Sequence, residues 1–260
     1  MKTSQIFKLL KQRLIPTLLL RDGRMVKGIE FDNYRDTGDP VYASRVYNAQ
    51  YVDELVFLDI DATNQSRATN KDIIAKVSKE CFMPLTIGGG IKHIDEIRNL
   101  LLVGADKVVI NTAAYENENL IKSSAEMFGS QCIIVGIDVC LENNDYVLYK
   151  NSGKVKADIS LLDHIKRMEA NGAGEFFINN ISRDGCMNGY DLDLINIITR
   201  NTKVPIIACC GAGNFMHLVD AYKNTAVSGL AMASIFHFGD NNPIRARAHL
   251  KNNKIQIKEV

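Results

Sequence analysis

The stretch KVVINTAAYENENLIKSSAEMFGSQCIIVGID (Lys107–Asp138) contains one complete strand–helix–strand unit of the chain. Short apolar runs at Lys107–Ile110 and Cys132–Ile137 predict two strands, and the amphipathic stretch Glu118–Phe128 between them predicts a helix. Short strands that are apolar on both faces are typical of parallel sheets covered by helices. The stretch therefore predicts two parallel strands joined by a helical crossover.

The same alternation continues through the rest of the chain. Six further apolar runs predict strands, at Leu14–Leu20, Leu55–Ile60, Leu85–Ile87, Glu175–Ile178, Pro205–Cys209 and Gly229–Met232. Seven further segments predict helices, at Tyr42–Tyr51, Asn70–Phe82, Ile94–Val103, Ile159–Ala170, Leu192–Thr202, Phe215–Asn224 and Pro243–Leu250. The polar, alternating stretch Asn143–Lys156 predicts a hairpin after the fifth strand. Eight strands alternating with eight helices predict an α/β protein with a single (β/α)₈ TIM barrel over residues 1–260, and a doubly wound open sheet is the alternative.

Two pairs of small-residue turns repeat in the two halves of the chain. TIGGGI (Thr86–Ile91) precedes INTAA (Ile110–Ala114), and ACCGAG (Ala208–Gly213) precedes AMASIF (Ala231–Phe236). In a barrel the loops after the strands gather at one face, where glycine turns and helix starts present N–H groups to anions. The repeat predicts a half-barrel symmetry and a ligand with two phosphates, or an elongated anion, between the turns. Turns that serve only backbone geometry are the alternative.

Composition excludes several function classes. The formal net charge of +1 gives no overall attraction to nucleic acid or to an anionic membrane, so neither partner is expected. No apolar run approaches the roughly 18 residues that a membrane span needs. Six cysteines without a C-x-x-C motif predict reduced thiols and a cytoplasmic protein. The five histidines lack ligand spacing, so neither a metal site nor a cofactor is expected.

Eight motifs resemble, in order, those of the HisF family, the cyclase subunit of imidazole glycerol phosphate synthase. They are RDGRMVKG (Arg21–Gly28), RDTGDP (Arg35–Pro40), ELVFLDI (Glu54–Ile60), IGGGI (Ile87–Ile91), GADKVVINTAA (Gly104–Ala114), FGSQCIIVGID (Phe128–Asp138), SRDGCMNGYD (Ser182–Asp191) and ASIFHF (Ala233–Phe238). The resemblance implies a barrel that takes ammonia from a HisH-like glutaminase partner in a heterodimer. It also implies a bis-phosphate ribulosyl substrate at the barrel mouth and a place in histidine biosynthesis.

The resemblance assigns binding roles to individual residues. The implied phosphate contacts are Gly90, Asn111 and Thr112 on one side and Asn180, Gly185, Gly211, Ala233 and Ser234 on the other. Lys27 resembles a mobile-loop lysine that helps to close over substrate. Asp184 either binds substrate hydroxyls or caps its own turn.

The resemblance also implies an ammonia gate of four charged residues at strand starts: Arg13, Glu54, Lys107 and Glu175. Charged groups inside a barrel are costly unless paired, and two cations can neutralise two anions. The alternative is that they point outward as solvated strand ends. Asp106, beside the gate, is a candidate contact of the glutaminase.

One catalytic position departs from the family. Asp138 matches one of the two aspartates that act as general acid and base, but the family motif C-L-D-V reads Thr17–Leu20 here. Leu19 therefore stands in place of the second aspartate, and losing positioned proton transfer costs on the order of 10²–10⁴ in rate. Asp61 follows the second strand with the same parity as Asp59, so we expect both to face the barrel interior. Asp61 is thus a candidate substitute for the lost acid.

Three further departures surround the same mouth. Cys140 replaces a lysine, Cys209-Cys210 replaces Ser-Gly, and Asn179 replaces a threonine. We interpret the chain as a HisF paralogue that receives ammonia but supports amidation of a sugar for surface polysaccharide (lipopolysaccharide), with a sugar amidotransferase as a further partner. One alternative is a genuine cyclase subunit of histidine biosynthesis. The other is a non-catalytic scaffold that activates the glutaminase, against which the glycine turns and Asp138 argue.

Overall fold

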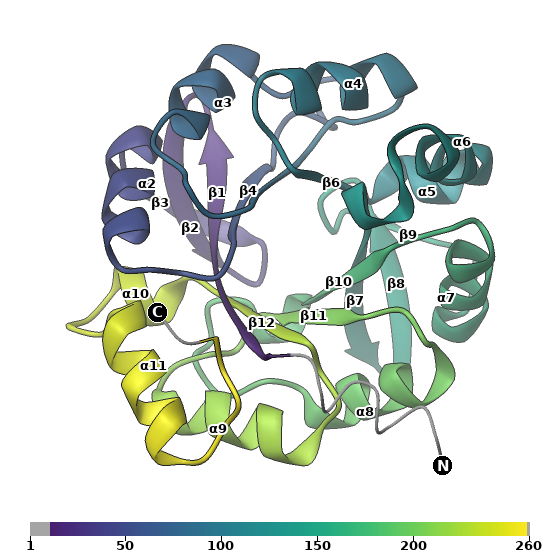
Figure 1. The fold of residues 1–260 in the computed structure, drawn as a ribbon. Coiled ribbons are helices and arrows are strands. Elements are labelled where there is room, and N and C mark those ends of the chain that lie inside the picture. The colour runs from purple at the N-terminus through teal and green to yellow at the C-terminus, as the bar shows by residue number, and fades with distance from the viewer. Residues whose placement is uncertain (1–10, 259–260) are drawn as a thin grey trace.

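Eight parallel strands form a closed barrel in the computed structural model, which describes residues 11–258 (Figure 1). The first ten residues and the last two, which the expected domain of 1–260 includes, lie outside the described residues. In order around the barrel the strands are β1 (Arg13–Arg21), β4 (Leu55–Asp59), β5 (Leu85–Gly88), β6 (Lys107–Ile110), β7 (Ile133–Glu142), β10 (Glu175–Asn180), β11 (Ile206–Cys209) and β12 (Gly229–Met232). Parallel pairing of β12 with β1 closes the ring. The expected barrel is confirmed, and the open-sheet alternative is wrong.

Helices surround the barrel on its outside (Figure 1). They are α2 (Pro40–Ala49), α3 (Lys71–Ser78), α4 (Ile94–Leu102), α6 (Glu118–Phe128), α7 (Leu161–Ala170), α8 (Leu192–Asn201), α9 (Phe215–Asn224) and α11 (Pro243–Asn252). Side-chain oxygens of Asn70, Ser160 and Asp191 accept backbone N–H groups and so fix where α3, α7 and α8 begin. None of the helices in residues 11–258 has the length and hydropathy of a membrane crossing.

The barrel interior is filled by one apolar cluster, separate from the larger core between strands and helices. Its buried members come from seven different strands: Ile15, Val56, Val109, Ile134, Phe177, Ile207 and Ala231. Side chains alternate between the two faces of a strand, so even-numbered residues of β4, such as Val56 and Leu58, face inward. This alternation also decides which polar residues reach the two ends of the barrel.

Two hairpins extend from the carboxyl ends of barrel strands. β2 (Arg24–Ile29) pairs antiparallel with the end of β1 and with β3 (Asp32–Gly38), in the segment where the resemblance implied a mobile loop around Lys27. The predicted hairpin at Asn143–Lys156 is confirmed, since β8 (Asp145–Lys150) pairs with β7 and with β9 (Val155–Lys156). Two short helices, α5 (Thr112–Glu116) and α10 (Ser234–His237), begin directly beyond β6 and β12. All four additions lie at the same end of the barrel.

Candidate active site

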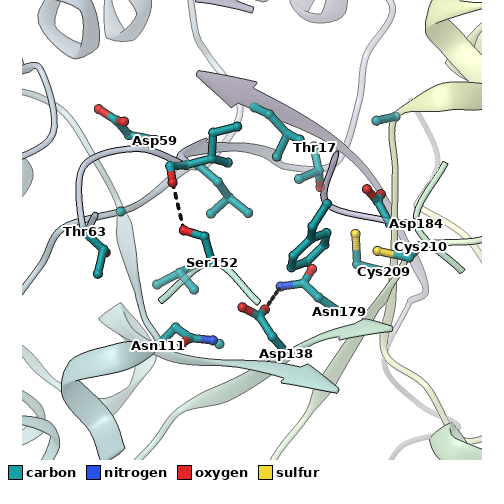
Figure 2. Close-up of a pocket in the computed structure, with 18 of the residues that line it drawn as sticks. Thr17, Asp59, Thr63, Asn111, Asp138, Ser152, Asn179, Asp184, Cys209 and Cys210 are labelled. Carbon is teal, nitrogen blue, oxygen red and sulfur yellow. Dashed lines mark hydrogen bonds between the residues drawn. The ribbon is translucent and has the colours of Figure 1, made fainter. Parts of the chain in front are cut away.

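A cavity that is partly open to solvent lies at the carboxyl end of the strands. This is the end at which barrel enzymes bind their substrates, and the space suits a phosphorylated small molecule. Both hairpins contribute to its walls, the first through Lys27 among others. The second contributes Ser152 (Figure 2). Ten residues predicted from the sequence line it: Lys27, Gly90, Asn111, Thr112, Asp138, Asp184, Gly185, Gly211, Ala233 and Ser234.

Two glycine turns bring backbone close to the cavity on different sides. Gly90 has a φ of +68°, and a Cβ atom there would lie 2.4 Å from the carbonyl oxygen of Arg67. Gly211 has a φ of +104°, and a Cβ atom would lie 2.1 Å from the carbonyl oxygen of Gly189. Both positions therefore require glycine. In addition, the buried side-chain amide nitrogen of Asn111 has no hydrogen-bond partner within the described residues, which leaves one donor for a ligand.

Asp138, near the middle of β7, is the carboxyl group best suited to proton transfer. Its carboxylate accepts a hydrogen bond of 2.8 Å from the side-chain amide of Asn179 (Figure 2). Burial raises the pKa of Asp138 to about 7; the Asn179 hydrogen bond lowers it, and the nearby charge of Asp184 raises it further. A group with a pKa near neutrality both accepts and donates protons efficiently at physiological pH.

The raised pKa of Asp138 predicts a pH-dependent effect on stability. In the unfolded chain this carboxyl ionises near its ordinary value of 3.8, whereas the folded protein retains the proton up to a pH of about 7. The contribution of the Asp138 carboxyl to the free energy of unfolding therefore falls as the pH rises from 3.8 to about 7, and it stays low above pH 7. An Asp138→Asn variant lacks this loss, and we expect its stability relative to wild type to rise by about 1–4 kcal/mol between pH 5 and pH 8.

Urea unfolding of both proteins at the two pH values measures this difference. The same difference at pH 5 and pH 8 would contradict an Asp138 pKa near neutrality.

Leu19 lies on the interior side of β1 and lines the cavity, so an apolar side chain occupies the position where the resemblance leads one to expect an aspartate. The expectation that Asp61 faces the barrel interior is wrong. Its carboxylate is paired with Arg21 through contacts of 2.8 and 3.1 Å and does not line the cavity. Asp59 lies at the cavity edge, but its carboxylate is bound by Arg67 and points away (Figure 2).

Asp59 and Asp61 point away from the barrel interior because side chains alternate between the two faces of a strand. Glu54, Val56 and Leu58 face the interior from β4, so odd-numbered Asp59 faces the other side. Alternation gives the same outcome at the end of β10, where Asn179 reaches the cavity and Asn180 does not. The side-chain amide of Asn180 instead donates to Asp191 at 2.9 Å, so the expectation of a direct phosphate contact by Asn180 is wrong.

Lys27 and Asp184 form a buried ion pair at the cavity. The Lys27 ammonium donates to the Asp184 carboxylate at 2.7 Å and to the carbonyl oxygen of Gly28 at 2.8 Å. The N–H of Glu30 donates to the Asp184 carbonyl oxygen at 2.8 Å, so the β2–β3 hairpin is fastened to the loop after β10. The second carboxylate oxygen of Asp184 is buried and has no partner in the described residues. Asp184 therefore does more than cap its own turn, and one of its oxygens is left for a ligand.

The four predicted gate residues meet at the opposite end of the barrel. Glu54 binds Arg13 at 3.0 Å and Lys107 at 3.0 Å, and Glu175 binds Lys107 at 3.2 Å and also Arg13, which closes a ring of ion pairs. Thr86 donates a further hydrogen bond of 2.7 Å to Glu54. Burial lowers the pKa of the Arg13 guanidinium, but Glu175 and Glu54 outweigh it and raise the pKa overall. The alternative of solvated strand ends is wrong.

Asp106 is exposed beside this ring, and its carboxylate accepts the N–H of Leu85 at 2.8 Å. It therefore fixes the start of β5 and still presents a charge on the surface. Its contact with a glutaminase stays a prediction.

Several cavity residues escaped the sequence analysis, among them Thr17, Phe31, Tyr34, Thr63 and Ser152. Most come from the hairpin segments and loops, whose position over the mouth depends on strand pairing and carries no local sequence signal. Thr17 is different: it precedes Leu19 by two residues, so parity alone places it on the same face. Its buried hydroxyl has no partner among the described residues. In residues 11–258 no three His, Cys, Asp or Glu side chains are arranged to hold a metal ion.

Comparisons with known proteins cover nearly the whole chain. The family described as "Histidine biosynthesis protein" matches residues 13–242. The imidazole glycerol phosphate synthase subunit HisF of Streptococcus mutans is 42% identical over 251 residues, which are 96% of this chain and 100% of the relative. The HisF subunit of a Hydrogenobaculum species is 43% identical over 251 residues, with the same coverage of 96% and 100%. The HisF subunit of Staphylococcus carnosus is 42% identical over 252 residues, 96% of this chain and 99% of the relative.

Proposed function

The chain belongs to the HisF family of histidine biosynthesis proteins, and we therefore propose that it is the ammonia-using subunit of a two-subunit synthase. One observation carries the proposal: a closed ring of ion pairs and a cavity with a carboxyl group of near-neutral pKa lie at opposite ends of one barrel. Ammonia enters at the ring and reacts at the cavity. A HisH-like glutaminase, bound over the ring and Asp106, supplies it.

The barrel interior supports transfer of neutral ammonia. The ring contains two cations and two anions and has no net charge. Beyond it, the interior cluster consists of apolar side chains such as Val56, Val109 and Phe177. Moving an ion through such surroundings is unfavourable, whereas a small neutral molecule passes at lower cost. Ammonium ions are therefore excluded, and NH₃ reaches the cavity.

At the cavity, the two glycine turns bind the phosphates of an elongated substrate and Asp138 transfers protons. The names of the relatives support imidazole glycerol phosphate synthesis, in histidine biosynthesis, as the reaction. This is the first candidate, and it places the chain among lyases of the cyclase type. Nothing in the comparisons supports the sugar amidotransferase partner or the polysaccharide role that the sequence interpretation preferred.

A second candidate is nitrogen transfer to a different acceptor, such as a sugar, and Leu19 is the observation that favours it. Within the described residues, Asp59 and Asp184 line the cavity with Asp138, but they are bound to Arg67 and Lys27. Asp138 therefore has no second, unpaired carboxylate on the β1 side of the cavity with which to share proton transfer. One proton-transferring group is enough to add ammonia to an acceptor, but a ring closure that requires an acid and a base proceeds more slowly.

Substrate binding tests the phosphate site on which the first candidate depends. We expect one bis-phosphate ribulosyl molecule to bind per chain in calorimetry, and Ser234→Asp to weaken binding about ten-fold or more, because it adds a negative charge at the second turn. The same substitution at exposed Ser130, outside the cavity, is the control and should leave affinity unchanged. Equal affinity of wild type and Ser234→Asp would remove the phosphate assignment.

Turnover distinguishes the two reactions. Wild-type protein is given the bis-phosphate ribulosyl substrate and ammonium chloride, which replaces the glutaminase. Formation of imidazole glycerol phosphate supports the first candidate. Binding without product supports transfer to another acceptor.

A further inference from the structure

Two adjacent cysteines, Cys209 and Cys210, both line the cavity (Figure 2). Neighbouring side chains on a strand normally point to opposite faces, so only one of two adjacent residues is expected inside. Here β11 ends at Cys209, and Cys210 has a φ of +80°, which turns the chain. The turn brings the second thiol to the same side as the first. This arrangement is independent of the HisF-type reaction proposed above.

The turn is firmly held by its surroundings. Cys209 packs against the apolar interior cluster, and Cys210 is buried. The next residue, Gly211, accepts a backbone hydrogen bond of 2.7 Å from the N–H of Gly189. A left-handed backbone is unfavourable for cysteine, and such outliers persist where the surrounding structure enforces them, frequently at functional sites. The two thiols are thus fixed near each other before any ligand arrives.

The chemistry of the pair favours chelation over oxidation. The Cys209 thiol is the main cause of a pKa of Cys210 well above the ordinary value, and burial adds to it. Oxidation and alkylation proceed through the thiolate, so they are slow at the Cys210 thiol. A trivalent arsenic oxide, by contrast, condenses with two neutral thiols. The R–As=O group forms two As–S bonds and loses its oxygen, which leaves as water with the two thiol protons, and no oxidation state changes.

We propose that Cys209 and Cys210 form a dithiol site that binds one soft, thiophilic centre, of the trivalent arsenic type, through both sulfur atoms. The site lies in the second glycine turn, next to Gly211, and on the same side of the cavity as Asp184. A bound centre fills the space through which an anion approaches this turn. Occupation of the dithiol therefore blocks the anion site of the second half-barrel.

Phenylarsine oxide is the probe, and intact-protein mass is the readout. We expect one adduct per wild-type chain that survives excess 2-mercaptoethanol, a monothiol, and is removed by 2,3-dimercaptopropanol. Cys209→Ser and Cys210→Ser should each lose this resistance, because a single As–S bond exchanges readily. Cys140→Ser and Cys186→Ser, which remove the other two cysteines near the mouth, should retain it.

Cys210→Gly covers the case in which a serine variant folds poorly, since glycine suits the left-handed backbone. No resistant adduct on folded wild type, or a resistant adduct on Cys209→Ser or Cys210→Gly, would overturn the proposal. Because the readout is mass, this outcome does not depend on whether the chain catalyses any reaction.

Discussion

Asp138→Asn is expected to lower ammonium-dependent kcat on the order of 10²–10⁴-fold, with a much smaller change in KM. The asparagine retains the size of the side chain and its place beside Asn179, so the cavity keeps its shape. It cannot take up or release a proton. The loss therefore falls on the chemical step, and steady-state kinetics with saturating ammonium chloride measures it.

The pH profile identifies the group responsible. Wild-type kcat should show an inflection near pH 7, where Asp138 titrates, and the inflection should be absent from Asp138→Asn. Asn179→Ala removes a hydrogen bond that lowers the Asp138 pKa, so the inflection should move to higher pH. Equal turnover of wild type and Asp138→Asn, or an inflection that persists in that variant, would exclude Asp138 as the proton-transferring group.

Glu54→Gln is expected to lower the free energy of unfolding by about 2–4 kcal/mol. The side chain of Glu54 is only 1% exposed, and its carboxylate binds both cations of the ring. Without it, Arg13 and Lys107 share Glu175 alone. These two side chains are 23% and 20% exposed, so solvent screens part of the loss, and the expected value lies below that of a fully buried pair.

Two further variants show whether the lost charge in the ring causes the destabilisation of Glu54→Gln. Glu80→Gln breaks the exposed ion pair of Glu80 with Arg45 and should change stability far less than Glu54→Gln does, because solvent screens the pair. Lys107→Met combined with Glu54→Gln restores a neutral ring and should recover part of the loss. Chemical denaturation compares all of them. A Glu54→Gln effect as small as that of Glu80→Gln would contradict a buried, mutually dependent ring.

The barrel was predictable because its strands are uniformly apolar. Four-residue strands such as Lys107–Ile110 and Gly229–Met232 agree with the predicted bounds, since apolar runs end where the chain leaves the interior. The β2–β3 hairpin was not predictable, because β3 is mostly exposed and its sequence DNYRDTG lacks an apolar alternation. Only its pairing with β2 makes it a strand.

The positions of the glycine turns and of the four charged residues were predicted correctly for a similar reason: backbone turns follow strands, and charged strand starts meet at one end. Side-chain orientation was predicted less well. Glu54 directly precedes β4, and Asp59 ends it five residues later, so the two cannot both face inward, and assigning both to the interior was inconsistent. The predictions that Asp61 faces the interior and that Asn180 contacts phosphate were wrong for this reason. The paired state of Asp184 depends on the hairpin, and no local pattern reveals it.

The most direct test of a cavity with one working carboxylate compares ammonium-dependent turnover of the bis-phosphate ribulosyl substrate by wild type and Leu19→Asp. Leu19 is only partly buried at the cavity wall, so an aspartate is tolerated there. Leu19→Asn, which is polar and of similar size but transfers no proton, is the matched control. We predict that Leu19→Asp turns over about ten-fold faster than wild type or more, and that Leu19→Asn does not. Wild-type turnover equal to that of a folded, substrate-binding Leu19→Asp protein would contradict this account.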